Sequence, residues 1–211
     1  MARENNPDLI IVDRSVGGKY ENYQTPEQQV PDSLLPYPWE TCMSMGNSWS
    51  YVSTDTYKST NKLIHLLCDI VAKGGNFLLN VGPDADGNLP DTALLRMKEI
   101  GEWMQVNGEA IYGTRPIYPF TYGKFRFTQK GDKVYGIFLL DEQESPVPET
   151  YWFDFPVPAD GPSAGLKMGK IKVLGCNKKA TLRKEADGRY RIDFPNNIEM
   201  PHAVVFEMQA K

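Results

Sequence analysis

The chain has 211 residues, of which 41% are apolar, so either one large domain or two small ones could bury a core. Its 23 basic and 27 acidic residues leave no basic excess, which argues against nucleic-acid binding and against polybasic attraction to a membrane. No apolar run approaches the roughly 20 residues needed to span a bilayer, and the polar opening MARENNPDLI does not resemble a signal peptide.

Up to Gly113, strand patterns alternate with helix patterns. Residues 8–13 (DLIIVD) form a short continuous apolar run, typical of a strand buried on both faces of a parallel sheet. The polar loop that follows, residues 14–38, is too long for an ordinary connection, and such loops are usually functional or disordered. Residues 39–45 (WETCMSM) are the second predicted strand.

A first helix is predicted over residues 58–73, with Ser59 as its N-cap and Gly74 as its stop signal. Its apolar side chains recur at helical spacing and form one face: Leu63, Ile64, Leu67, Ile70 and Val71. Residues 76–81 (NFLLNV) then read as a third strand, because the run is short, apolar and preceded by two glycines.

A second helix follows a turn at residues 82–89. Pro90 opens it, since the first helical position tolerates a missing N–H, and Asn107-Gly108 ends it. We expect one buried face made of Leu94, Met97, Ile100 and Met104.

This order of strands and helices predicts an α/β arrangement with parallel strands. Three parallel strands alone would leave both sheet edges exposed, so we infer a further portion upstream of this segment.

From Lys124 the apolar period changes to two. Short strands are predicted at 124–127, 133–140, 170–174, 189–194 and 203–208, with Asp187-Gly188 as a hairpin turn and residues 141–169 as a Pro- and Gly-rich loop. This pattern indicates a β-sandwich, so we expect an α/β domain over residues 1–115 and an all-β domain over residues 116–211. A core role is expected for the aromatic residues Tyr118, Phe120, Tyr122 and Trp152.

Three residues of the α/β part follow strand ends or lie on the adjoining loops, where barrel enzymes carry catalytic groups. Arg14 can offer a fork of donors to a carboxylate or a sugar hydroxyl, or can form a salt bridge that supports its loop. Glu27 can serve as an acid or base, or is one ordinary surface glutamate among 27 acidic residues. Trp49 suits stacking against a sugar, although tryptophan also serves plain packing.

Other chemistries lack support. The cysteines Cys42, Cys68 and Cys176 are odd in number and widely spaced, so we interpret them as small buried hydrophobic residues rather than as disulfide or zinc ligands. His65 and His202 share no metal-ligand spacing with them. No phosphate-binding glycine fingerprint and no nucleophile elbow is present, so we expect no metal and no cofactor.

Five segments together resemble the α-L-fucosidases of glycoside hydrolase family 29: DLIIVDR, NYQTPEQQVP, PWETCMSMGNSWSY, VAKGGNFLLNVGPDADGNLP and IGEWMQVNGEAIYGTRP. The resemblance covers about residues 8–116. It implies the C-terminal part of a (β/α)8-like barrel followed by a β-sandwich, and hydrolysis of terminal α-L-fucose with retention, without a metal.

Carried over from this resemblance, Glu27 matches the acid/base position, Arg14 an arginine of the fucose pocket and Trp49 an aromatic residue lining it. The aspartate nucleophile and the pocket histidines of the family have no counterpart here. We therefore predict that this chain alone lacks fucosidase activity, and that it is part of an exo-acting retaining enzyme.

The alternative is a non-catalytic carbohydrate-binding or structural β-sandwich module that retains a remnant of a glycosidase barrel. The expected partner is a fucosylated glycan substrate, with no nucleic acid and no membrane insertion, whereas oligomeric state stays open. Family members imply a secreted or periplasmic location for a full-length parent.

Overall fold

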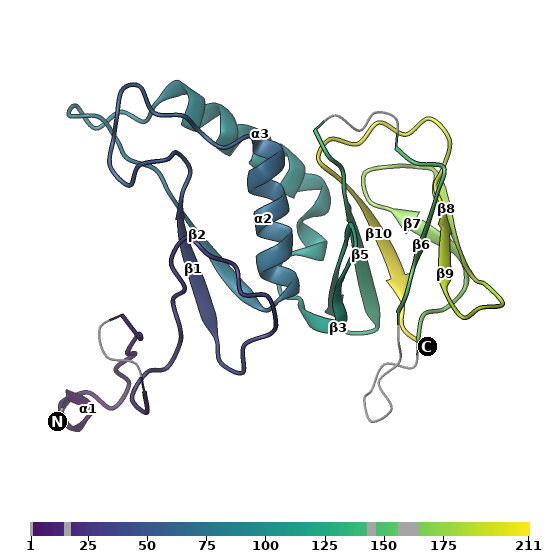
Figure 1. Cartoon of the computed structure of the whole chain (residues 1–211), viewed down its shortest axis with the longest axis horizontal. Coiled ribbons are helices and arrows are strands. Elements are labelled where there is room, and N and C mark those ends of the chain that lie inside the picture. Colours follow the sequence, from purple (N-terminus) through teal and green to yellow (C-terminus); the bar gives the residue numbers. More distant parts are fainter. Residues whose placement is uncertain (1, 15–17, 143–146, 156–164) are drawn as a thin grey trace.

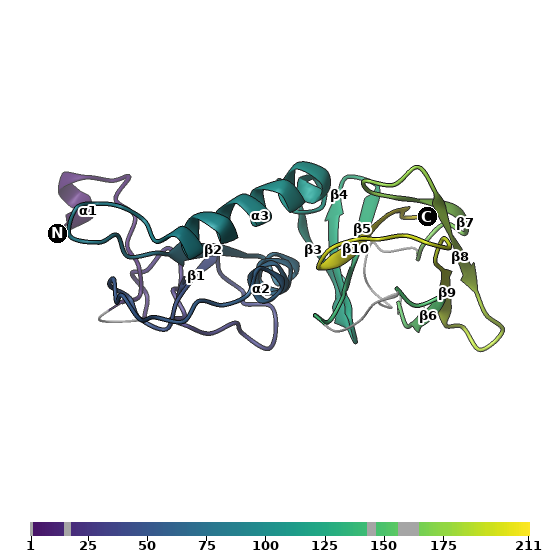
Figure 2. The same cartoon turned by 90° about the horizontal axis from the view of Figure 1, so that it is seen from above.

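The computed structural model describes residues 2–14, 18–142, 147–155 and 165–211. The elements in chain order are α1 Ala2–Asn5, β1 Trp39–Ser44, α2 Thr60–Ala72, β2 Gly75–Asn80, α3 Asp91–Asn107, the 3-10 turn η1 Gly108–Ala110, β3 Arg115–Tyr122, β4 Phe125–Lys130, β5 Lys133–Leu139, β6 Thr150–Phe153, β7 Gly169–Val173, β8 Lys179–Lys184, β9 Tyr190–Asp193 and β10 Ala203–Gln209. Helices α2 and α3 lie between the β1–β2 sheet and a larger sheet (Figures 1 and 2). Within the described ranges, no helix is long and apolar enough to cross a membrane.

Strands β1 and β2 are parallel and in register, from Trp39 opposite Gly75 to Ser44 opposite Asn80, as the sequence predicted. Their carboxyl ends therefore meet at one edge of the sheet. Gly75 is required here, because a Cβ at this position would lie 2.4 Å from the Trp39 ring.

Helix α2 begins and ends where its capping residues predicted. The Ser59 hydroxyl accepts a hydrogen bond from the Lys62 amide at 3.2 Å. Gly74 follows the C-terminus with a φ of +79°, a left-handed conformation that glycine adopts without strain.

The strand predicted over residues 8–13 is wrong. Val12 makes only an isolated bridge to Tyr23, and Ile10 is 71% exposed. The physical reason lies in the following loop, where Gln24 bridges Trp39 and Glu27 bridges Cys42. The loop therefore occupies the free edge of β1, with which a strand formed by residues 8–13 would have to pair.

The predicted buried face of α3 is partly wrong. Leu94 and Met97 are 48% and 38% exposed, whereas Ala93, Trp103 and Asn107 are buried. A different side of the helix therefore contacts the rest of the molecule, and the residues on that side recur at helical spacings of three, four and seven. Of the predicted face, Ile100 and Met104 do pack partly against the core.

The second half is one antiparallel sheet of eight strands in the order β3-β4-β5-β10-β7-β8-β9-β6. It curls over a shared core, because the Phe125 ring of β4 lies 4.8 Å from the Phe153 ring of β6 at the far edge of the strand order. This curled sheet agrees with the predicted β-sandwich. Strand β6 lies within the loop predicted over 141–169, of which residues 143–146 and 156–164 are outside the described ranges.

The sequence did not predict β3, β6 and β8. Pro116 and Pro119 interrupt the pattern of β3, and proline cannot donate to a ladder. The expected core role of the aromatic residues is wrong for two of them: Tyr118 is 52% exposed and Trp152 is 44% exposed, both on edge strands. Phe120 and Tyr122 are half-buried.

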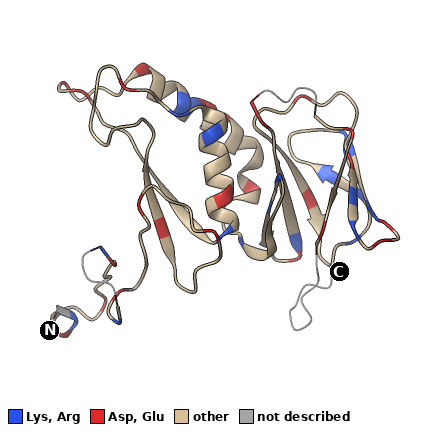
Figure 3. Cartoon of the chain, in the orientation of Figure 1, with Lys and Arg blue, Asp and Glu red and all other residues tan. Residues whose placement is uncertain are grey.

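The outer face of β5 and β10 is covered by helices α2 and α3. Ile64, Cys68 and Trp103 form one buried cluster with Ile137 and Val205 of the sheet. An ion-pair network crosses the same junction, in which the Asp69 carboxylate binds Arg126 of β4 at 2.5 Å and Lys73 at 2.9 Å. Elsewhere, charges of both signs are interspersed over the two halves (Figure 3).

We expect Ile64→Ala to lower the free energy of unfolding by about 2–5 kcal/mol, because it opens a cavity between helix and sheet. Ile64 is fully buried, whereas Ile10 is 71% exposed, so Ile10→Ala is the matched control and should change stability by less than about 0.5 kcal/mol. Urea unfolding followed by circular dichroism measures both. Equal effects of the two substitutions would contradict the helix–sheet packing.

Candidate functional site

A cavity of about 650 Å³ opens at the carboxyl ends of β1 and β2. Its lining comes from five places along the chain: Arg14, Glu27, Cys42, Trp49 and Leu78–Val81. The three residues that the sequence singled out, Arg14, Glu27 and Trp49, thus share one concavity. Sequence reasoning missed Cys42 and the end of β2.

Arg14 is the electrostatic centre of this cavity. Its Nη1 donates to Glu27 Oε2 at 2.6 Å, and its Nη2 donates to Cys42 Sγ at 2.9 Å. The hydrogen bond to Glu27, followed by that to Cys42, raises the pKa of the Arg14 guanidinium. The Arg14 and Glu27 side chains are each about half exposed, at 47% and 48%, so a ligand can reach both.

The loop that carries Glu27 is held against β1 by its backbone. Glu27 bridges Cys42, and the Gln28 amide donates to the Cys42 carbonyl at 2.9 Å. Gln28 has a φ of +55°, which is uncommon for a residue other than glycine. The bonds to β1 therefore hold the chain in a conformation that it would not adopt by local preference.

Asp13 ties the Arg14 segment to the same loop. Its Oδ1 accepts hydrogen bonds from the Thr25 amide and the Thr25 hydroxyl, both at 2.9 Å. The segments that carry Arg14 and Glu27 are therefore held together by hydrogen bonds one and two residues away from these side chains.

Trp49 reaches the cavity on a loop after β1, and its carbonyl accepts from the Asn80 side chain at 2.8 Å. The Trp49 side chain is 42% exposed, which leaves ring surface free for a ligand. Gly82, just after β2, allows this loop to approach closely, since a Cβ there would lie 2.4 Å from the Tyr51 amide nitrogen.

The base of this loop is closed by Asp55. Its carboxylate accepts hydrogen bonds from the backbone amides of Asn47 at 3.1 Å, Ser48 at 3.0 Å and Thr56 at 2.8 Å. Desolvation pushes the pKa of Asp55 upward, but these amide bonds outweigh it and the net pKa is lowered. The sequence offered no signal for this role, which depends on the loop's backbone conformation.

The cavity joins a carboxylate, a guanidinium and an indole ring. The guanidinium can donate to hydroxyl oxygens, and the ring can cover the C–H face of a sugar. The ion pair with Arg14 contains Glu27 as a carboxylate, the form that can activate water. To protonate a leaving group, Glu27 must first take up a proton and exchange its contact with Arg14.

The cysteines do not share one environment. Cys68 is fully buried, and desolvation raises the pKa of its thiol. Cys42 is buried but contributes to the cavity, so the interpretation as core packing is incomplete for it. Cys176 is only half-buried, which contradicts that interpretation. Among the described residues, no group of three or more His, Cys, Asp or Glu side chains is arranged to hold a metal ion.

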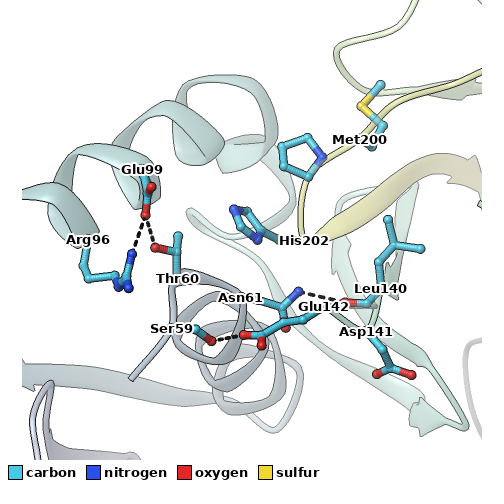
Figure 4. A pocket seen from close by; sticks show the side chains of 11 residues that line it. Ser59, Thr60, Asn61, Arg96, Glu99, Leu140, Asp141, Glu142, Met200 and His202 are labelled. Atoms are coloured by element: carbon cyan, nitrogen blue, oxygen red, sulfur yellow. Dashed lines mark hydrogen bonds and ion pairs between the residues drawn. The ribbon is translucent and has the colours of Figure 1, made fainter. Parts of the chain in front are cut away.

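A second, polar cavity of about 360 Å³ lies where α2 and α3 meet the loops after β5 and before β10 (Figure 4). Its polar groups largely bind one another: Glu99 accepts from Arg96 at 3.1 Å and from Thr60, and Asn61 donates to the Leu140 carbonyl at 2.8 Å. His202 points between them with a φ of +68°, and desolvation lowers its pKa. Of these contacts, the one from Asn61 to Leu140 connects the two halves of the molecule.

We expect Gly82→Ala to displace the loop that carries Trp49 and to destabilise the protein by about 1–3 kcal/mol, because backbone atoms of Ser50 and Tyr51 occupy the space of the new methyl group. Gly101→Ala is the matched control, since nothing lies within 4 Å of its Cβ position in mid-helix. That control should stabilise α3 by about 0.5–1 kcal/mol. Indole N–H resonances in NMR spectra report the movement of Trp49, and an unshifted Trp49 resonance in Gly82→Ala would contradict the close approach.

Comparison with known proteins identifies the family. The family model described as Alpha-L-fucosidase matches residues 1–109. The chain is 44% identical over 118 residues to an alpha-L-fucosidase of Dictyostelium discoideum, covering 52% of this chain and 25% of that protein. It is 34% identical over 124 residues to human tissue alpha-L-fucosidase, covering 56% of this chain and 27% of that protein. The chain thus spans about a quarter of the length of these relatives.

Solved structures agree over nearly the whole chain. Alpha-L-fucosidase isoenzyme 1 from Paenibacillus thiaminolyticus superposes with a TM-score of 0.74 at 25% identity, covering 100% of this chain and 52% of that one. The Thermotoga maritima alpha-fucosidase in complex with fucose gives a TM-score of 0.73 at 26% identity, covering 98% and 46%. By its sequence match over half its length and by its fold, the chain belongs to the α-L-fucosidase family.

Proposed function

We propose that this chain contributes the Arg14–Glu27–Trp49 side of a fucose pocket in a retaining, exo-acting α-L-fucosidase that hydrolyses terminal α-L-fucose from glycoconjugates. The observation that carries this proposal is the convergence of these three side chains, from three separate segments, on one cavity at the carboxyl ends of β1 and β2. The fucose named in the complex of the Thermotoga maritima relative supports this sugar as the ligand.

In this proposal Arg14 donates hydrogen bonds to sugar hydroxyls, and Trp49 covers the apolar face of the sugar and its methyl group. Glu27 is the acid/base residue, which first protonates the leaving oxygen and later activates water. Retaining glycosidases place a second carboxyl roughly 5–5.5 Å from the first as nucleophile. We assign no nucleophile to any residue of this chain.

We also propose that residues 1–115 are the C-terminal part of the catalytic barrel domain and residues 116–211 a separate β-sandwich domain. In support, β3 begins at Arg115 and pairs with β4 of the eight-stranded sheet, whereas the two strands before it, β1 and β2, pair only with each other among the described strands.

We expect the chain to bind L-fucose, and Arg14→Gln and Trp49→Ala each to weaken this binding about tenfold through loss of a charge-assisted hydrogen bond or of ring contact. Saturation-transfer NMR with L-fucose measures the affinity. Trp152→Ala is the control, because this tryptophan is exposed to a similar degree, 44% against 42%, on the distant strand β6. A wild-type chain without saturable fucose binding would overturn the assignment of this cavity.

We further expect the purified chain to release no product from an aryl α-L-fucoside, because a retaining mechanism requires two carboxyls and only Glu27 is assigned here. The assay is spectrophotometric detection of the aryl alcohol over several hours. Turnover that Glu27→Gln abolishes would show that the chain contains a nucleophile and would refute this prediction.

A further inference from the structure

A second groove, about 680 Å³ in volume, lies at the opposite ends of the same two strands. Four segments form it: residues 34–38 before β1, Leu67 and Val71 of α2, residues 73–77 around the start of β2, and residues 111–116 before and within β3. The last segment belongs to IGEWMQVNGEAIYGTRP, one of the runs that carry the family resemblance, although none of its residues reaches the Arg14 cavity.

The groove presents two tyrosine rings to solvent. Tyr37 is 55% exposed and Tyr112 is 67% exposed, and neither phenol has a hydrogen-bond partner among the described residues. Leu34 beside them is 40% exposed. Tyrosine combines an apolar face with a polar tip, so this rim suits a ligand that offers both C–H faces and hydroxyl groups.

The walls of the groove are fixed before any ligand binds. The Tyr112 amide donates to the Gly108 carbonyl at 2.8 Å, and Lys130 Nζ donates to the Tyr112 carbonyl at 3.1 Å. The Tyr112 ring lies where a Cβ on Gly108 would be only 3.2 Å away, so glycine leaves room for this ring. On the other wall, the Trp39 indole donates to the Lys73 carbonyl at 3.1 Å. A preformed groove loses little conformational entropy on binding.

The groove carries few charges. Lys73 is neutralised by Asp69 at 2.9 Å, and the remaining cation, Arg115, has one guanidinium nitrogen bound to the Thr114 carbonyl at 2.9 Å. Arg115 and the Asn76 amide can donate to hydroxyl oxygens at the two sides. A cationic partner finds no carboxylate among the lining residues, and a single guanidinium gives a polyanionic partner little complementary charge.

We propose that this groove is a second carbohydrate-binding site, which takes neutral sugar units that need not contain fucose and stacks them on Tyr37 and Tyr112. The choice of a sugar over another neutral ligand rests on the proposed function. The groove is not a subsite of the Arg14 cavity, because it lies at the other end of strands that are roughly 15–20 Å long. It also uses Phe77, whose side chain points to the opposite face from that of Leu78 in the cavity.

Two separated sugar sites on one chain give a branched or surface-bound glycan two points of attachment. The second contact is then intramolecular, and the overall affinity exceeds that of either site alone. The groove would therefore hold the protein on a glycan while the Arg14 cavity engages a terminal fucose.

The test is saturation-transfer NMR of the whole chain with N-acetyllactosamine, a neutral disaccharide without fucose. We expect saturable binding that Tyr37→Ala and Tyr112→Ala each weaken about tenfold, the size of one lost aromatic contact. Tyr37→Phe and Tyr112→Phe keep the ring and lose only the phenol hydroxyl, so they should retain most of the binding that the alanine variants lose. Both tyrosines are exposed, so thermal unfolding of the alanine variants should match the wild type.

Trp49→Ala separates this inference from the proposed function. It should weaken L-fucose binding and leave disaccharide binding unchanged, whereas Tyr112→Ala should do the reverse. The inference is overturned if the wild type shows no saturable disaccharide binding, if the alanine variants bind normally, or if Trp49→Ala abolishes the signal. It is also overturned if a decaproline peptide, the other ligand that aromatic grooves accept, displaces the disaccharide and binds more tightly.

Discussion

The structure depends on the apolar contact between helices α2 and α3 and the outer face of β5 and β10. Ile64 and Trp103 from the helices meet Ile137 and Val205 from the sheet, while the inner face of the same sheet packs on Phe125 and its neighbours. Strand β5 is therefore buried on both faces, which antiparallel strands tolerate only when a second layer covers them. Because α2 directly precedes β2 in the chain, the same contact also places the β1–β2 sheet relative to the eight-stranded sheet.

The two ends of the β1–β2 sheet provide different surfaces. At the carboxyl ends, loops anchored by Asp13, Asp55 and the bridge between Glu27 and Cys42 bring charged and aromatic groups into one cavity. At the amino ends, glycines and the end of a helix leave a groove with exposed rings and few charges. A single parallel pair can therefore present a polar cavity at one end and a separate groove with exposed aromatic rings at the other, since its two ends are built from different connections.

Much of this arrangement could be predicted from local patterns. The helix predicted over 58–73 is α2, and the runs around Trp39 and Phe77 are β1 and β2, because apolar spacing, the Ser59 cap and the Gly74 stop are short-range signals. Most strands of the second half were found by alternation with period two. Where the pattern was interrupted by proline, as in β3, pairing with a neighbour decided the strand despite the sequence.

The sequence by itself determined which segments can form helices and strands, and it singled out Arg14, Glu27 and Trp49 as residues at strand ends. Only the tertiary structure decided that residues 8–13 do not form a strand, that Leu94 and Met97 face solvent, and that Cys42 contributes its sulfur to the cavity. The reason is that periodicity records how a side chain relates to its neighbours along the chain. Which edge of β1 is occupied, and which side of α3 is covered, depend on segments distant in sequence whose packing no local pattern contains.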